Sequence, residues 1–180
     1  MTCIVGLERP EGVYIGGDSA AISSSVASIT RVPKVFRIQD LVFGCAGGFR
    51  AAQLIQHSFV PPEKLADISD MAYMVTAVVS KLRDLLSTEP ETLTTDLQAL
   101  IGYNGTLYQF WTQDWQINSS DYGYYALGSA WEVALGAMYC LVNQDINPED
   151  ILIEALDAAT QHCIHVRPPY SICFIQKEKP

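Results

Sequence analysis

The sequence predicts an α+β protein, a four-layer αββα sandwich in which two antiparallel sheets are each covered by helices. Short runs rich in β-branched and aromatic residues come in groups. These groups are separated by longer stretches with the three-and-four spacing of apolar residues that is typical of amphipathic helices. Strands that come in groups, rather than alternating singly with helices, favour antiparallel sheets over βαβ units.

The first quarter of the chain is predicted to be a β-meander. Its strands are expected over residues 3–8, 13–18, 34–38 and 41–46. The first two are joined by Arg9-Pro10-Glu11-Gly12, which has proline and glycine where a hairpin turn needs them. The Ser-rich segment 21–30 is predicted to be a loop.

The middle of the chain is predicted to contain two helices followed by three strands. Helical spacing covers residues 49–59 and 66–86, and strand patterns cover 97–103, 106–111 and 122–127. Asn104-Gly105 between two of these runs is a strong signal for a tight hairpin. The polar stretch 112–121 is predicted to be a connection.

The last part of the chain is predicted to hold two helices and a closing strand. The helices cover 131–143 and 148–163, and the strand covers 171–176. Asn147 can cap the second helix, because Pro148 follows it at the first helical position. The sequence shows no repeat and no linker, so residues 1–180 are predicted to be a single domain.

Composition excludes several classes of function. A formal net charge of -9 argues against a nucleic-acid partner, because phosphate binding needs clustered lysine and arginine. No apolar run reaches the length of a membrane span, and we expect no membrane association and no secretory signal. Most of the five cysteines lie in apolar runs, which favours reduced thiols and a cytoplasmic location.

Thr2, Asp18 and Lys34 together can carry nucleophilic chemistry. A hydroxyl needs a base to take its proton, and removal of Met1 would give Thr2 one in its own α-amine. A nearby ammonium, here Lys34, lowers the pKa of that amine, and Asp18 can hold Lys34 charged and in place. Taken singly, each residue also has a plain structural interpretation, as a strand end or an exposed charge.

Two further places can complete such a site. Gly47-Gly48, between a predicted strand and a helix, can expose backbone N–H groups to an oxyanion, or can simply form a tight turn. Ser129 can cap the helix that follows it, or can join a polar network near the amine. His162, Cys163 and His165 resemble metal ligands, but a helix end explains the histidines, and we expect no metal.

These motifs together resemble the proteasome β-subunit family, nearest to its bacterial HslV branch. The resemblance runs in order through residues 2–5, 16–18, 34–35, 43–55, 124–138 and 151–166. The family begins its mature chain with threonine and places aspartate and lysine at successive intervals of sixteen residues, which Thr2, Asp18 and Lys34 keep. The resemblance implies the fold of the N-terminal nucleophile (Ntn) hydrolases and a threonine-type endopeptidase.

The resemblance also implies roles for individual residues. Thr2 is the expected nucleophile, Asp18 and Lys34 the charged pair, Gly48 the oxyanion donor with Gly47 beside it, and Ser129 a partner near the amine. The substrate pocket is expected to involve Ala21, Val32, Ala46, Gly47 and Arg50. A small Ala46 leaves room for a bulky apolar side chain, whereas Arg50 would favour an acidic one.

The family forms rings of its own subunits that are usually fed by an AAA+ unfoldase, and its chemistry needs no cofactor. We therefore expect protein or peptide substrates and homo-oligomeric rings. One departure weakens the prediction, because Gln161 stands where the family has an aspartate near the site. The alternatives are a catalytically weak or inactive ring protein and an Ntn amidase that acts on small acyl amides.

Overall fold

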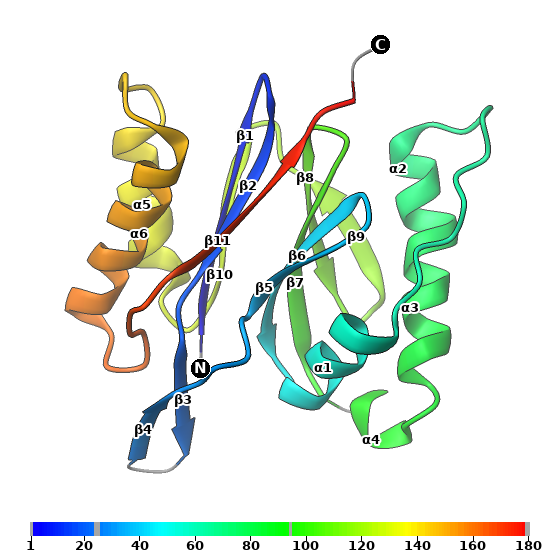
Figure 1. Cartoon of the computed structure of the whole chain (residues 1–180), viewed down its shortest axis with the longest axis horizontal. Helices are drawn as coiled ribbons and strands as arrows, with labels where there is room; N and C mark the ends of the chain where they lie inside the picture. The colour runs from blue at the N-terminus through cyan, green and yellow to red at the C-terminus, as the bar shows by residue number, and fades with distance from the viewer. Residues whose placement is uncertain (1, 24–25, 94, 179–180) are drawn as a thin grey trace.

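Two antiparallel sheets lie face to face between two helical layers in the computed structural model (Figure 1), which describes residues 2–23, 26–93 and 95–178. The first sheet has the order β10-β1-β2-β11. Its strands are β1 (Cys3–Arg9), β2 (Gly12–Gly17), β10 (Tyr124–Gly128) and β11 (Ser171–Gln176). The second sheet has the order β5-β6-β7-β8-β9. Its strands are β5 (Val35–Ile38), β6 (Leu41–Gly47), β7 (Leu97–Tyr103), β8 (Thr106–Trp111) and β9 (Gln116–Ser119).

Helices cover the outer face of each sheet (Figure 1). The first sheet is covered by α5 (Trp131–Leu141) and α6 (Pro148–His162). The second is covered by α1 (Phe49–Ser58) and by the continuous helical segment α2 (Asp70–Tyr73), η1 (Met74–Val78) and α3 (Val79–Leu86). A short helix, α4 (Pro90–Leu93), leads back to β7. The predicted four-layer αββα architecture is confirmed.

Three apolar layers hold the sandwich together. Strand β1 contributes to two of these layers, because its run Cys3-Ile4-Val5 is buried on both faces. Cys3 and Val5 pack with the helices α5 and α6, whereas Ile4 packs in the core between the sheets. A third cluster, which includes Phe43 of β6, fills the space under α1 and α3. A strand buried on both faces reads as a continuous apolar run rather than an alternating one, as β1 does.

Most predicted elements are present, with three corrections. Segment 21–30, predicted to be a loop, contains the strands β3 (Ala20–Ser23) and β4 (Val26–Ile29), which pair with each other as a separate two-stranded sheet. The polar stretch 112–121, predicted to be a connection, contains edge strand β9. An edge strand buries little, so it lacks the apolar signal that reveals a central strand. The helix predicted from residue 66 begins only at Asp70, where the Ser69 side chain caps it.

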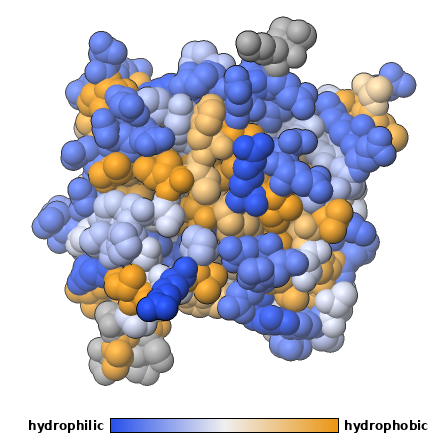
Figure 2. All heavy atoms as spheres, in the orientation of Figure 1, coloured by the Kyte–Doolittle hydropathy of each residue, from blue (hydrophilic) through white to orange (hydrophobic). Residues whose placement is uncertain are grey.

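The surface combines hydrophilic and hydrophobic patches on the face shown in Figure 2. Several large apolar side chains stay exposed, including Tyr122, Tyr139 and Ile164, which are 81%, 71% and 71% exposed. Among the described residues, no helix combines the length and apolar character that crossing a bilayer requires.

Gly128 fixes the position of the first described residue. It lies opposite Cys3 in the pairing of β1 with β10, and its φ of +95° belongs to the left-handed region. A Cβ at Gly128 would lie 1.9 Å from the carbonyl oxygen of Thr2. Only glycine therefore lets β10 approach the start of β1 this closely.

Gly128→Ala is expected to lower the free energy of unfolding by about 3 kcal/mol, because it adds backbone strain and a clash with main chain. Urea denaturation of the two proteins measures the difference. The matched control is Gly136→Ala in α5, where an added Cβ meets no atom within 4 Å. It should be neutral or stabilise by about 1 kcal/mol. Equal effects of the two substitutions would contradict this account.

Candidate active site

Thr2 lies at the start of β1 and is held by its main chain. The residue is 3% exposed, and its carbonyl accepts a hydrogen bond of 2.7 Å from the Ser129 N–H. The next residue, Cys3, donates its N–H to Asp18 Oδ1 at 3.0 Å. The backbone on both sides of the Thr2 side chain is therefore fixed by groups from two other segments.

Asp18 joins the segments that meet at this place. Its carboxylate is buried and accepts from four donors: the Cys3 N–H, the Lys34 ammonium, the Ala20 N–H at 2.9 Å and, more weakly, the Arg167 N–H at 3.4 Å. A buried carboxylate is stable as an anion only when donors surround it in this way. Asp18 therefore fixes the start of β1 relative to Lys34.

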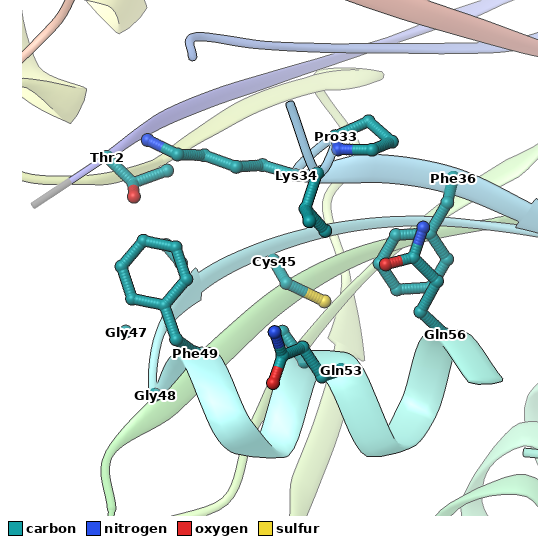
Figure 3. Close-up of a pocket in the computed structure, with 13 residues that line it drawn as sticks. Thr2, Pro33, Lys34, Phe36, Cys45, Gly47, Gly48, Phe49, Gln53 and Gln56 are labelled. Carbon is teal, nitrogen blue, oxygen red and sulfur yellow. The ribbon is translucent and has the colours of Figure 1, made fainter. Parts of the chain in front are cut away.

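Lys34 pairs with Asp18 at 2.8 Å, and both side chains are almost fully buried, with 5% and 0% exposed. Its main-chain carbonyl accepts the Cys45 N–H at 2.9 Å, which anchors the residue just before β5. In Figure 3 the Lys34 side chain extends along the pocket and its nitrogen lies toward Thr2. The three residues predicted from their spacing are thus brought together.

Burial sets the protonation of the groups around Thr2. Desolvation lowers the pKa of Lys34 below its ordinary value of 10.5, and the Asp18 carboxylate opposes this shift. Burial, with a contribution from Asp18, raises the pKa of the Cys3 thiol to about 12. Cys3 is therefore a neutral and unreactive thiol at neutral pH.

Gly47 and Gly48 form the turn from β6 into α1. Gly47 has a φ of +100°, and a Cβ there would lie 2.1 Å from the Asp96 carbonyl oxygen. The Gly48 N–H donates to that carbonyl at 3.2 Å. The N–H predicted to bind an oxyanion is thus already engaged, and its role stays a prediction that requires this bond to exchange.

Ser129 does not cap the helix that follows it. The N-cap of α5 is Ala130, and no side chain bonds to it there. Ser129 is exposed and contacts Thr2 through its backbone N–H, so the capping interpretation is wrong. Its place beside Thr2 agrees with the alternative interpretation, a partner near the α-amine, which stays a prediction.

An apolar pocket opens beside Thr2 (Figure 3). It includes Val32, Ala46 and Gly47, as predicted, with Lys34 and Cys45. Helix α1 adds side chains that sequence reasoning missed. These are Phe49, Ala52, Gln53 and Gln56. Their spacing of three, four and seven marks one face of a helix, and this signal is present in the sequence.

Two residues predicted for the pocket do not line it. Arg50 lies one position off the pocket face of α1, and its guanidinium pairs with Glu89 outside the pocket. It therefore supplies no positive charge there. Ala21 lies on β3 and is also absent from the lining.

Among the described residues, the loop after α6, and not Gln161, donates a hydrogen bond to Asp18. Gln161 is exposed in the last turn of the helix. The contact comes from the Arg167 backbone, six positions later, and the neighbouring Ser19 N–H donates to the Arg167 carbonyl at 3.0 Å. A backbone contact carries no side-chain signal, so the sequence could not reveal it.

No protein-family profile and no curated sequence matches the chain, whereas solved structures match along nearly its whole length. BPH from Thiobacillus denitrificans in complex with epoxomicin has a TM-score of 0.80 at 15% identity, over 99% of this chain and 100% of that one. Eukaryotic HslV from Trypanosoma brucei has a TM-score of 0.72 at 16% identity, over 97% and 99%. Anbu, an ancestral β-subunit from Yersinia bercovieri, has a TM-score of 0.72 at 15% identity, over 97% and 81%.

The chain has the proteasome-like Ntn-hydrolase fold. The resemblance seen in the sequence is thereby confirmed at the level of the fold. In this fold, the Asp18–Lys34 pair, Gly47 and Gly128 lie around the start of β1.

Asp18→Asn is expected to lower the free energy of unfolding by about 3–5 kcal/mol, because it leaves the Lys34 ammonium buried without its counter-charge. Urea denaturation at neutral pH measures the loss. The matched control is Asp70→Asn, which removes the carboxylate charge from the Lys64–Asp70 pair. In that pair the Lys64 side chain is 30% exposed and the Asp70 side chain 27% exposed. That control should cost about 1 kcal/mol or less. Similar losses would show that the buried pair has no special structural role.

Proposed function

We propose that the chain is an N-terminal threonine peptidase that hydrolyses peptide bonds through an acyl-enzyme on Thr2 once Met1 has been removed. One observation carries the proposal. The buried Asp18–Lys34 pair lies beside Thr2, and the same carboxylate holds the N–H of Cys3, the residue that follows Thr2. A structural ion pair alone does not explain why the ammonium lies toward a threonine at the start of the chain (Figure 3).

The geometry supports a two-step reaction. The Thr2 hydroxyl gives its proton to the α-amine, and the oxygen attacks the carbonyl carbon of the scissile bond. The resulting oxyanion collapses, the C–N bond breaks, and the leaving amine takes the proton. Water then attacks the ester in the same way and releases the acid. The Lys34 ammonium lowers the pKa of the α-amine, which keeps a fraction of that amine neutral near pH 7.

The pocket beside Thr2 favours an apolar residue on the acyl side of the cleaved bond. Its lining is largely hydrophobic, and its one charged residue, Lys34, is neutralised by Asp18. Phe49, Cys45 and Ala46 would contact such a side chain, and Gln53 contributes an amide. Because Arg50 is outside the pocket, we propose no preference for acidic residues there.

We also propose that the chain assembles into a homo-oligomeric ring in the cytoplasm. The proteasome-like fold supports self-assembly. The exposed side chains of Tyr139, on α5, and Ile164, after α6, are the kind of surface that a subunit contact buries. An AAA+ unfoldase as partner remains part of this proposal.

An inactive ring protein is the second candidate. The Gly48 N–H bonds to the Asp96 carbonyl, and Gln161 is exposed and does not line the pocket beside Thr2. Both features favour a site that has the threonine and the ion pair but lacks a free oxyanion donor and the expected aspartate. A probe that reacts only with a working terminal threonine separates the two candidates.

A peptide epoxyketone is expected to label Thr2 in protein whose intact mass shows loss of Met1, because the probe needs both the hydroxyl and the free α-amine. BPH, which shares the fold at 15% identity, was solved in complex with epoxomicin, a compound of this class. Mass spectrometry measures the adduct. Thr2→Ala should remove it, and Thr88→Ala, an exposed threonine after α3, should not.

Met-free protein that stays unlabelled would overturn the peptidase and favour the inactive ring. Labelling that persists in Thr2→Ala would show that another nucleophile reacts.

The pH profile of kcat/KM is expected to be bell-shaped. Activity should rise as the α-amine of Thr2 loses its proton, with an apparent pKa below about 7.7 because of the Lys34 ammonium. It should fall as Lys34 itself deprotonates, below the ordinary value of 10.5, because burial lowers that pKa. Initial rates between pH 6 and pH 10 measure both limbs.

Lys34→Arg keeps its proton throughout this range and should lose the alkaline limb. The same alkaline limb in this variant would exclude Lys34 as its source.

A further inference from the structure

A second pocket adjoins Thr2 on the side away from the apolar one. Both pockets are lined by Thr2, Ala46 and Gly47, so a peptide bond held at Thr2 has one pocket on either side. The second pocket is completed by Asp96, Gln98, Gly128, Ser129 and Trp131. The second pocket is more polar than the first, and the proposed reaction at Thr2 does not use the Asp96 carboxylate.

The start of β7 presents this carboxylate to the pocket. Side chains alternate along a strand, so Gln98 lies on the same face as Leu100, which packs in the core between the sheets. Asp96 directly precedes the strand, is exposed and lines the pocket together with Gln98. Both residues therefore lie on the face of the second sheet that is turned toward β1 and Thr2.

The pocket combines a negative charge with an aromatic surface. Asp96 takes part in none of the ion pairs that the described residues form, whereas Lys34, Arg50 and Lys64 each have a carboxylate partner. Trp131, the first residue of α5, is 38% exposed. A carboxylate beside an indole ring suits an ammonium or guanidinium group, which gains an ion pair and a cation–π contact.

The positive end of the α5 dipole lies at the same pocket and works against a cation. It carries about half an elementary charge, less than the full charge of the Asp96 carboxylate. Glu132, in the first turn of α5, also offsets it. No lysine or arginine is among the described residues that line the pocket. The balance of charge therefore favours a basic group.

We propose that this pocket binds a basic side chain, lysine or arginine, on the amine side of the cleaved bond, and that Asp96 determines this preference. The proposal rests on the proposed peptidase function and extends it. Cleavage then favours an apolar residue before the scissile bond and a basic residue after it.

The test uses internally quenched peptides with leucine before the cleaved bond and lysine, glutamine or glutamate after it. The expected order of kcat/KM is lysine, then glutamine, then glutamate, with lysine over glutamate by about 10-fold. Asp96→Asn should bring that ratio close to one, and Asp96→Lys should reverse it. Asp84→Asn, an exposed aspartate on α3, is the matched control and should keep the preference.

Binding to the Thr2→Ala variant gives a second measurement that needs no catalysis. The indole N–H resonance of Trp131, assigned with Trp131→Phe, should shift on addition of the lysine peptide and not of the glutamate peptide. The shift should be lost in Thr2→Ala/Asp96→Asn.

Active enzyme with no preference for lysine, or a preference that survives Asp96→Asn, overturns this proposal and leaves the peptidase intact. Failure of Thr2 to react with the epoxyketone overturns the peptidase instead. In that case the Trp131 resonance decides whether the pocket binds a basic group, and an unchanged resonance overturns the basic subsite as well.

Discussion

One buried carboxylate holds the centre of this molecule together. Asp18 lies at the end of β2 and accepts hydrogen bonds from the start of β1, from the ammonium before β5 and from the loop after α6. These segments belong to both sheets and to the last helical layer. Because the carboxylate is desolvated, loss of the Lys34 ammonium would leave an uncompensated charge in the interior, and loss of a backbone N–H donor would leave that charge less well stabilised. The arrangement around Thr2 is therefore fixed by the same contacts that fix the fold.

The architecture could be predicted from the sequence because its central elements bury both faces or a wide helical stripe. The hairpin at Asn104-Gly105 and the cap at Asn147 have local signatures, and both are found where predicted. The edges carry weaker signals. Strand β9 is short and polar, whereas the β3–β4 pair is short and leaves apolar residues such as Val26 and Ile29 exposed. Both are recognised as strands by their pairing rather than by burial.

The residues of the candidate site also differ in how well the sequence predicts them. The spacing of Thr2, Asp18 and Lys34 reveals the side-chain cluster, since these roles depend on residue type. The backbone contacts of Arg167, Ser129 and Gly48 could not be predicted, because any residue supplies an N–H and only the tertiary path aims it. The lining from α1 was missed for a different reason. A shift of one residue on a helix turns a side chain by about 100°, which separates Arg50 from Phe49.

The fourfold coordination of Asp18 also bears on how such a protein can change over generations. A relative with the same buried pair but no catalytic activity would still need this carboxylate and its lysine to remain folded, so selection for stability would preserve both. The hydrogen bond from the Ser129 N–H to the Thr2 carbonyl, by contrast, is made by the backbone and does not depend on the side chain at position 2. The Asp18–Lys34 pair therefore supports the proposed activity only in combination with the Thr2 side chain toward which the ammonium lies.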